Sequence, residues 1–435
     1  MILGRAAGRT SLTQGEPVDL RLVPVAAGMW AAVLVGLSGS GPVTVGVTVA
    51  ALVTATLALT GTSRGRCRWV VVLVGLAVAS GVITGAARVA AVQTGPVSGL
   101  AAEGAAVSVL GTVLEDPVAS DSQFDPDAQT FVVSFRVEDV AGRGVRTSVR
   151  TPVTVLASDP EWSALLPGQR VAADGLLIAT DRHDVAAMLR VNGPPAPRGP
   201  PSAVSQATEP LRAGLRAAVE HGWGPGRVLV PALVVGDEAL VPEPMQEEMR
   251  DTGLTHLMAV SGTNVTIIVV GVLALARLVG VRGYALPAVG LLALVGFVFL
   301  ARPEPSVVRA GVMGAIAVLG VTVAGRRRGV SALATATTVL LVVDPWLARS
   351  AGFALSVLAT AAILVLVPAW LDAMGWLPPT PAVLLAAPLA AQIACLPVLV
   401  VISEQFSLAA VPANLLAAPA VPPATILGVI ATVVA

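Results

Sequence analysis

Stretches of about twenty apolar residues recur along this chain. Three lie near the N-terminus, at about 23–39, 42–60 and 69–91, and a second set lies near 254–279, 284–301, 306–324, 330–347, 350–371, 380–402 and 407–435. A helix that rises about 1.5 Å per residue needs about 20 residues to cross about 30 Å of hydrocarbon. The pattern therefore predicts a polytopic α-helical membrane protein with about ten transmembrane helices.

Between the two apolar blocks the pattern changes to short patches in which apolar and polar residues alternate. Such patches occupy 106–114, 130–137, 148–156 and 170–178, and Gly, Asp and Pro residues separate them. Alternation with a period of two is typical of strands with one buried face. The region predicts an inserted small β domain, and both an OB-like barrel and a small sandwich remain open.

After this region the spacing becomes helical. Leu211, Leu215 and Val219 recur at helical intervals. An amphipathic helix of this kind suits a connector on the membrane surface. The predicted organisation is an N-terminal three-helix membrane unit at 1–91, an OB-like β domain at 92–200, an amphipathic helical connector at 201–253 and a membrane channel domain at 254–435.

Composition supports the membrane assignment. Hydrophobic residues make up 55% of the 435 residues and charged residues only 12%, and the mean hydropathy is +0.82. Soluble domains carry about 25% charged residues. A soluble domain of ordinary composition does not fit these values, and a formal net charge of zero gives the chain no bulk attraction for a polyanion.

Arginines between the apolar runs predict the orientation of the chain. Short loops rich in basic residues stay in the cytoplasm. Arg64–Arg68 separates the second and third runs, and Arg282 and Arg326–Arg328 fall in two later connections on the same side. We expect a protein of the cytoplasmic (plasma) membrane in which residues 92–250 are extracytoplasmic. The same topology puts Arg302–Pro305 and the Asp344-Pro345 turn near the β domain.

A series of short motifs fills the C-terminal half. Gly236-Asp237-Glu238 is followed by MRDTGLTHLMAVSGTNV at 249–265. The remaining motifs are PEPSVVR at 303–309, Asp344-Pro345 with GFALS at 352–356, Ala391-Gln392 with Pro397, and FSL at 406–408 with PANLL at 412–416. This ordered set resembles the competence protein family ComEC, the inner-membrane channel for DNA uptake in natural transformation. The resemblance covers nearly the whole chain from residue 230 onward, and the N-terminal helices followed by an external OB-like domain match the family's architecture.

The resemblance implies a channel that conducts one DNA strand inward and performs no chemistry of its own. It implies single-stranded DNA and the lipid bilayer as partners, together with an extracytoplasmic DNA receptor and a cytoplasmic helicase-like ATPase, and no cofactor or metal. Many family members also carry a metallo-β-lactamase-like domain, proposed as the nuclease. Here the chain stops in an apolar segment and its only histidines are His183, His221 and His256. We therefore expect no nuclease activity, and either a truncated chain or a separately supplied nuclease.

The polar run Ser261-Gly262-Thr263-Asn264 interrupts a predicted span and is the expected place of the pore or its gate. Backbone that leaves a helix inside a membrane must find partners in protein or water. On one continuous helix, with about 100° per residue, His256 and Asn264 lie about 80° apart and can face one lumen. Small polar residues that stabilise helix packing are the alternative. Family members often have histidine at the position of Asn264, so a role that needs an imidazole there does not transfer.

Other candidates for the DNA path are polar or cationic residues within the motifs or directly next to them. Arginines in such a path offset phosphate charge, and Arg302 and Arg309 suit this role, although arginines at span ends also snorkel to the interface. The remaining path candidates are Ser306, Asp344, Gln392 and Asn414. Secondary candidates are Asp237, Glu238, Arg250 and Asp251, for which a solvated acidic turn and an interfacial Arg–Asp pair are the plainer interpretations.

Two other functions fit parts of the sequence. An intramembrane hydrolase would use Ser261 and His256 as nucleophile and base, but on one helix these lie about 140° apart. A small-solute or lipid transporter would share the interrupted spans. DNA binding by the β domain has weak support, because residues 92–225 contain ten arginines against fifteen acidic residues. A structural cap or a docking surface for a DNA receptor is the alternative role of this domain.

Overall fold

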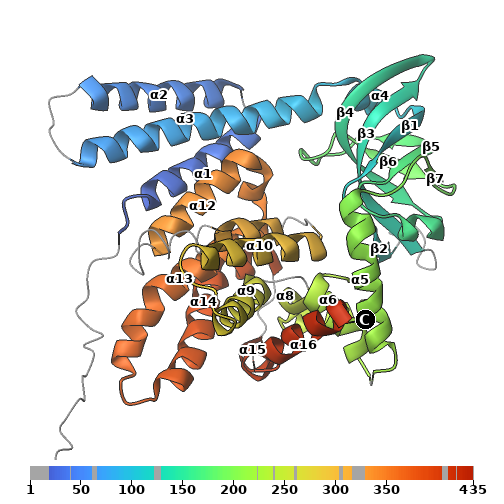
Figure 1. Ribbon diagram of the computed structural model, residues 1–435. Coiled ribbons are helices and arrows are strands. Elements are labelled where there is room, and N and C mark those ends of the chain that lie inside the picture. The colour runs from blue at the N-terminus through green and yellow to red at the C-terminus, as the bar shows by residue number, and fades with distance from the viewer. Residues whose placement is uncertain are drawn as a thin grey trace, which may run out of the picture.

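The computed structural model divides into a β-rich part and a larger helical part (Figure 1). It describes residues 19–39, 41–60, 66–121, 129–222, 224–238, 241–258, 262–302, 307–315, 329–403, 410–417 and 419–434. The α-helices are α1 (Val23–Leu37), α2 (Gly41–Thr60), α3 (Arg66–Gln93), α4 (Pro96–Ala102), α5 (Ala203–Glu220), α6 (Gly226–Val235), α7 (Glu243–Asp251), α8 (Thr255–Met258), α9 (Gly262–Leu278), α10 (Ala285–Leu300), α12 (Gly329–Val343), α13 (Ala351–Ala373), α14 (Pro379–Ser403), α15 (Ala410–Ala417) and α16 (Val421–Val434). Two short 3-10 helices are η1 (Pro160–Ala164) and η3 (Pro345–Arg349), and the strands are β1 (Ala106–Val113), β2 (Val118–Asp121), β3 (Gln129–Gly142), β4 (Val145–Ala157), β5 (Arg170–Ile178), β6 (Met188–Val191) and β7 (Ala196–Pro197).

Glycines bring α1 and α3 into close contact in the N-terminal unit. A Cβ atom added at Gly36 of α1 would lie 2.5 Å from the carbonyl oxygen of Val82, and one added at Gly85 of α3 would lie 2.9 Å from the carbonyl oxygen of Val33. Small residues let helix backbones approach closely inside a membrane, where burial of apolar surface between helices gains little. Gly36 and Gly85 therefore fix how α1 lies against α3.

Arginines at helix ends join the N-terminal unit to the C-terminal helices. Nη2 of Arg349 in η3 donates to the carbonyl oxygen of Leu37 at 2.8 Å, and Nη2 of Arg88 in α3 donates to the carbonyl oxygen of Val343 at 3.2 Å. The last carbonyls of a helix lack partners within the helix and favour a nearby cation. Each unit thus supplies an arginine that caps a helix of the other.

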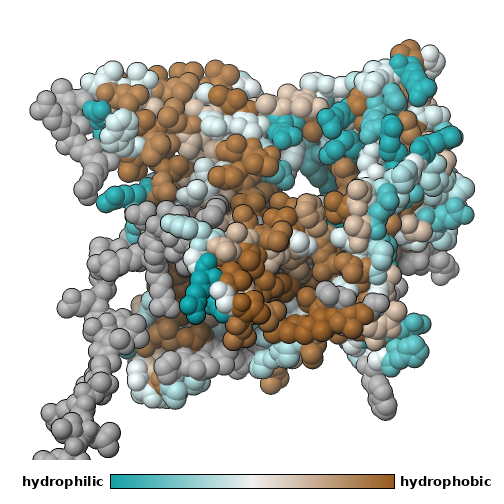
Figure 2. Space-filling model, in the orientation of Figure 1, coloured by the Kyte–Doolittle hydropathy of each residue, from teal (hydrophilic) through white to brown (hydrophobic). Residues whose placement is uncertain are grey.

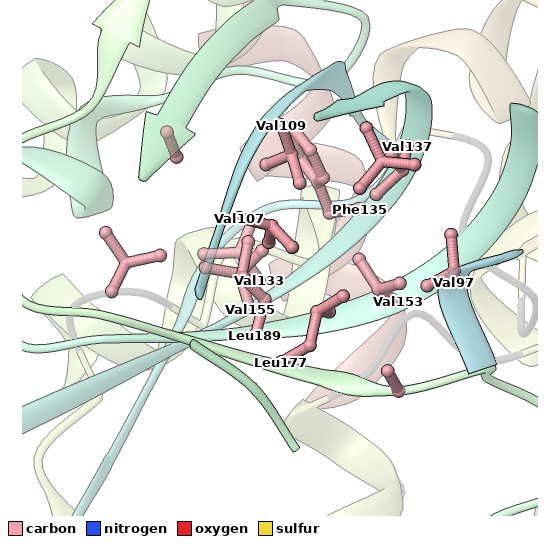
Figure 3. Close-up of a cluster of buried hydrophobic side chains, with 14 of the residues drawn as sticks. Val97, Val107, Val109, Val133, Phe135, Val137, Val153, Val155, Leu177 and Leu189 are labelled. Atoms are coloured by element: carbon pink, nitrogen blue, oxygen red, sulfur yellow. The ribbon is translucent and has the colours of Figure 1, made fainter. Parts of the chain in front are cut away.

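Five strands close into a ring in the β domain. β1 pairs with β3 and with β5, β3 pairs with β4, and β6 joins β4 to β5, with the β4–β6 pair parallel and the others antiparallel. Side chains from β1, β3, β4, β5 and β6, with Val97 of α4, converge on one apolar core (Figure 3). The alternating patches predicted β1, β3, β4 and β5. The strands β2, β6 and β7 have four residues or fewer, too few to set a period.

The predicted spans correspond only in part to continuous helices. Among the described residues, four segments are long and apolar enough to cross a membrane, namely Gly41–Thr60, Arg68–Gln93, Ala351–Ala373 and Pro381–Val401, and six further apolar helices are shorter. The span predicted at 254–279 divides into α8 and α9, and the last one contains α15 and α16, where Pro422 and Pro423 restart the helix. Helix α6, within the predicted surface connector, is itself apolar.

Apolar residues cover the helical part from outside. Figure 2 shows hydrophobic side chains over the helices and hydrophilic ones gathered over the β domain. Large apolar side chains such as Leu57, Val401 and Leu427 are more than half exposed. Apolar patches of this extent, on helices long and apolar enough to cross a membrane, indicate a surface that faces lipid. The chain is a membrane protein.

Candidate functional site

Helix α6 ends inside the protein, where side chains from two other helices cap it. The helix stops at Gly236, which has a left-handed backbone with φ of 70° that glycine adopts without a steric penalty. Nδ2 of Asn264 in α9 donates to the carbonyl oxygen of Leu233 at 2.7 Å, and Nη1 of Arg212 in α5 donates to that of Val235 at 2.6 Å. Both capping side chains are buried, Asn264 completely. They supply partners to carbonyls that water cannot reach.

Six charged residues lie next to this helix end, and we call them the charge cluster. They come from four parts of the chain: the connection after β1, helix α5, the residue after Gly236 and the end of α10. The members are Asp116, Glu209, Arg212, Arg216, Asp237 and Arg302. The cluster therefore joins the β domain, the α5 connector and the C-terminal helices, as the course of α5 in Figure 1 illustrates.

The ion pairs of the charge cluster form a closed ring. Asp116 pairs with Arg302 and with Arg212 at 3.5 Å, and Asp237 pairs with Arg212 at 3.8 Å. Glu209 and Asp237 each pair with Arg216, and Glu209 also pairs with Arg302. Every carboxylate thus bridges two guanidinium groups, and three positive charges balance three negative ones.

Because the ring of ion pairs is buried, the loss of one of its members lowers the stability of the fold. The Arg212 side chain is 2% exposed, and those of Asp237 and Arg302 are 6% exposed. A buried charge is tolerated when it is paired and hydrogen-bonded, and removal of one partner leaves an uncompensated charge. Burial lowers the pKa of Arg216, but hydrogen bonds to Glu209 and Asp237 raise it by more, so the net pKa is raised. Arg216 therefore stays charged.

Arg302 holds an uncommon backbone conformation at the end of α10. Its φ is 61°, in the left-handed region that costs a non-glycine residue about 1–2 kcal/mol. Two carboxylates from separate parts of the chain hold its guanidinium group. Surrounding structure keeps a backbone in such a region when it offers compensating contacts. The snorkelling interpretation of Arg302 is wrong because the side chain is buried among protein carboxylates.

The structure brings Asp237, Asn264 and Arg302 together around the end of α6. Asp237 is 6% exposed, so the solvated-turn interpretation is wrong for this residue, whereas the neighbouring Glu238 is exposed. Asn264 also accepts a 3.4 Å hydrogen bond from Thr425 of α16. These polar residues stabilise contacts between helices in the described conformation. Their proposed place in a DNA path remains a prediction.

Residues of two further motifs lie close together at the start of α13. The guanidinium group of Arg309 lies beside Gly352, because a Cβ atom added there would be 3.6 Å from Nη2 of Arg309. PEPSVVR and GFALS are thus neighbours in space. Asp344 accepts a hydrogen bond from the backbone N–H of Trp346 at 3.1 Å and caps η3. Trp346 packs against the core of the β domain, so this turn lies next to that domain, as predicted.

The other candidates are more dispersed. Gln392 and Asn414 are half-buried on α14 and α15, Arg250 and Asp251 are exposed on α7, and Gly262 begins α9. Ser261 and Ser306 lie outside the described residues, and only the backbone of His256 and Thr263 is described. His256 belongs to α8 and Asn264 to α9, and residues 259–261 between them lie outside the described residues, so the angles for one continuous helix stay a prediction.

Sequence reasoning did not identify four members of the charge cluster. Glu209, Arg212 and Arg216 are spaced by three and four residues, which places them on one face of α5. That spacing in an amphipathic helix indicates that one face of α5 carries charged residues that can pair with one another or with other segments. Asp116 gave none, because its partners are distant in sequence.

Comparison with known proteins identifies the C-terminal half. The family described as Competence protein matches residues 233–435, which begin in the last turn of α6. This segment is similar to the competence protein family. Within this family, ComE operon protein 3 of Bacillus subtilis (strain 168) is 30% identical over 191 residues, which are 44% of this chain and 24% of that relative. The match thus spans about a quarter of the relative's length, and no solved structure matches the chain.

Replacement of Asn264 by alanine is expected to destabilise the segment that matches this family by about 1–3 kcal/mol, because the buried carbonyl of Leu233 loses its donor. Chemical or thermal unfolding in detergent would measure the change. Thr266, exposed on the same helix, provides the control, and its replacement by alanine should change stability by less than about 0.5 kcal/mol. Equal effects of the two variants would contradict the capping role of Asn264.

Proposed function

We propose that this chain forms a passage for one strand of DNA across the plasma membrane during natural transformation. The observation that carries the proposal is the family match over residues 233–435, whose motifs supply the buried Asp237 and Asn264 and the half-buried Arg309. A phosphate chain needs a wet route with polar groups, and interrupted helices supply polar backbone along such a route. The breaks at α8–α9 and α15–α16 support this role.

The proposal treats the described arrangement as a closed form of the passage. Asn264 has no exposed surface and contacts α6 and α16. A strand could pass beside Asn264 only if α6 or α16 moved away from α9. The gate in this proposal is therefore the contact of α6, α9 and α16.

The β domain is proposed to be OB-like and extracytoplasmic. Its ring order β1-β3-β4-β6-β5, with a parallel β4–β6 pair, supports a five-stranded Greek-key barrel of that kind. In this position it would serve as a cap or as a docking surface for a DNA receptor. A cytoplasmic helicase-like ATPase would supply energy and a separate nuclease would degrade the other strand, so that this chain contributes no catalysis.

Deletion of the gene, followed by measurement of labelled DNA that enters the cytoplasm, tests the proposal. We expect uptake to be lost in the deletion strain while DNA still binds the cell surface, and the intact gene to restore uptake. A Ser261→Ala variant should also restore it, because the passage needs no nucleophile. Uptake at the wild-type level in the deletion strain would refute the function, and failure of Ser261→Ala alone would favour a hydrolase.

A further inference from the structure

Several arginines near the β domain have partners within the protein. Near the β domain they bond to carboxylates or helix carbonyls; these are Arg88, Arg212, Arg216, Arg302 and Arg349. Arg68, Arg277 and Arg282 form no ion pair or hydrogen bond with any residue that the structure describes. Arg277 and Arg282 are exposed, and Arg68 is half-buried with its guanidinium group over the ring of Trp69.

Helix direction places these three arginines away from the β domain. The C-terminal end of α3 leads into α4 and β1, so Arg68 lies at its far end. Helix α10 ends next to the charge cluster, so the α9–α10 turn with Arg277 and Arg282 lies one helix length away. The 16 residues of α10 correspond to about 24 Å. Both places are thus at the end remote from the β domain.

Exposed aromatic residues occur at the same end. Trp69 is 57% exposed, with the guanidinium group of Arg68 5.3 Å from its ring, and Tyr284 after the α9–α10 turn is 96% exposed. Helix α13 starts beside the β domain, so the α13–α14 turn with Trp376, 79% exposed, lies at the remote end (Figure 1). Tryptophan and tyrosine concentrate where lipid meets water.

We infer that this end is a surface that binds the headgroups of anionic phospholipids. The surface consists of Arg68, Trp69, Arg277, Arg282, Tyr284 and Trp376, and we call it the headgroup surface. Its arginines outnumber the acidic residues described nearby, which are Asp372 and Asp19, the latter paired with Arg21. The excess positive charge is complementary to anionic headgroups.

Apolar neighbours favour lipid over nucleic acid as the partner. Leu278 and Val279, directly after Arg277, are 84% and 73% exposed. Acyl chains cover such side chains while the phosphate of the same lipid meets the guanidinium group, whereas a nucleic acid leaves them in water. This combination of arginine, aromatic and aliphatic residues is suited to a bilayer surface.

The inference is tested on the full chain in nanodiscs of phosphatidylcholine and phosphatidylglycerol. After mild delipidation, mass spectrometry measures the ratio of the two lipids that remain bound. We expect phosphatidylglycerol to be enriched on the wild type and the enrichment to fall about fivefold for each arginine lost in Arg277→Gln/Arg282→Gln. Lysine at both positions should retain most of it.

Arg143→Gln/Arg146→Gln in the β domain provides the matched control, because both side chains are exposed and the same charge is lost. If both double-glutamine variants unfolded at the wild-type temperature and retained the same enrichment of phosphatidylglycerol, the headgroup surface would be refuted. If inorganic phosphate displaced the bound lipid, the surface would recognise phosphate in general, and the inference that it binds lipid headgroups would be refuted. A single-stranded oligonucleotide that binds in place of phosphatidylglycerol, through the same arginines, would assign the surface to nucleic acid and overturn the inference.

Discussion

Replacement of Arg212 by methionine is expected to lower the free energy of unfolding by about 3–5 kcal/mol. The guanidinium group of Arg212 lies between Asp116 and Asp237 and donates to the carbonyl oxygen of Val235. Methionine fills much of the same volume. It leaves Asp116, Asp237 and the carbonyl oxygen of Val235 without the partner that Arg212 supplies. Unfolding in detergent, followed by circular dichroism or intrinsic fluorescence, measures the loss.

Arg143→Met supplies the comparison for this prediction. Arg143 pairs with Glu103 on the surface of the β domain, and its side chain is 61% exposed. Exposed ion pairs contribute about 0–1 kcal/mol, so this variant should remain close to the wild type. A loss at Arg212 as small as the loss at Arg143 would mean that the charge cluster does not hold the β domain on the helices.

Addition of a single methyl group at Gly36 is expected to destabilise the N-terminal unit by about 1–3 kcal/mol. The new Cβ atom in Gly36→Ala would lie 2.5 Å from the carbonyl oxygen of Val82, closer than such atoms can come, so α1 would have to move away from α3. A disulfide engineered across the α1–α3 contact would report the movement as slower cross-linking. Thermal unfolding would report the loss of stability.

Gly46→Ala tests whether the effect comes from packing. Gly46 lies within α2, and an added Cβ atom would meet nothing within 4 Å. Alanine is the better helix former, so this variant should be neutral or stabilised by up to about 1 kcal/mol. Destabilisation of both variants to the same degree would exclude close helix packing as the cause.

The fold follows from the sequence where a regular period extends over many residues. The apolar runs predict α1, α2, α3, α13 and α14 closely, and alternation predicts the four longer strands. The polar run at 261–264 predicts an interruption of the span at 254–279, but it does not predict which other helix contacts that place. Asn264 of α9 donates to the carbonyl oxygen of Leu233 in the last turn of α6, and this tertiary contact has no local signal.

The sequence predicts several residues of the candidate site, but it does not predict what each side chain does there. Sequence motifs single out Asp237, Asn264 and Arg302, and the structure brings them to one place. The ion pair of Arg302 with Asp116 could not be foreseen, because the two residues are 186 positions apart. The positions of the motifs identify the site, whereas the roles of its side chains depend on charges contributed by segments outside the motifs.

The separation between Asp116 and Arg302 also bears on the order of biogenesis. Synthesis from the N-terminus completes the β domain long before α10 emerges, and contacts between distant segments form late. Until then Asp116 and Glu209 each lack Arg302, one of their two final partners. Closure of the ring is therefore an end point of assembly, reached only by chains whose C-terminal helices have been inserted in the correct orientation.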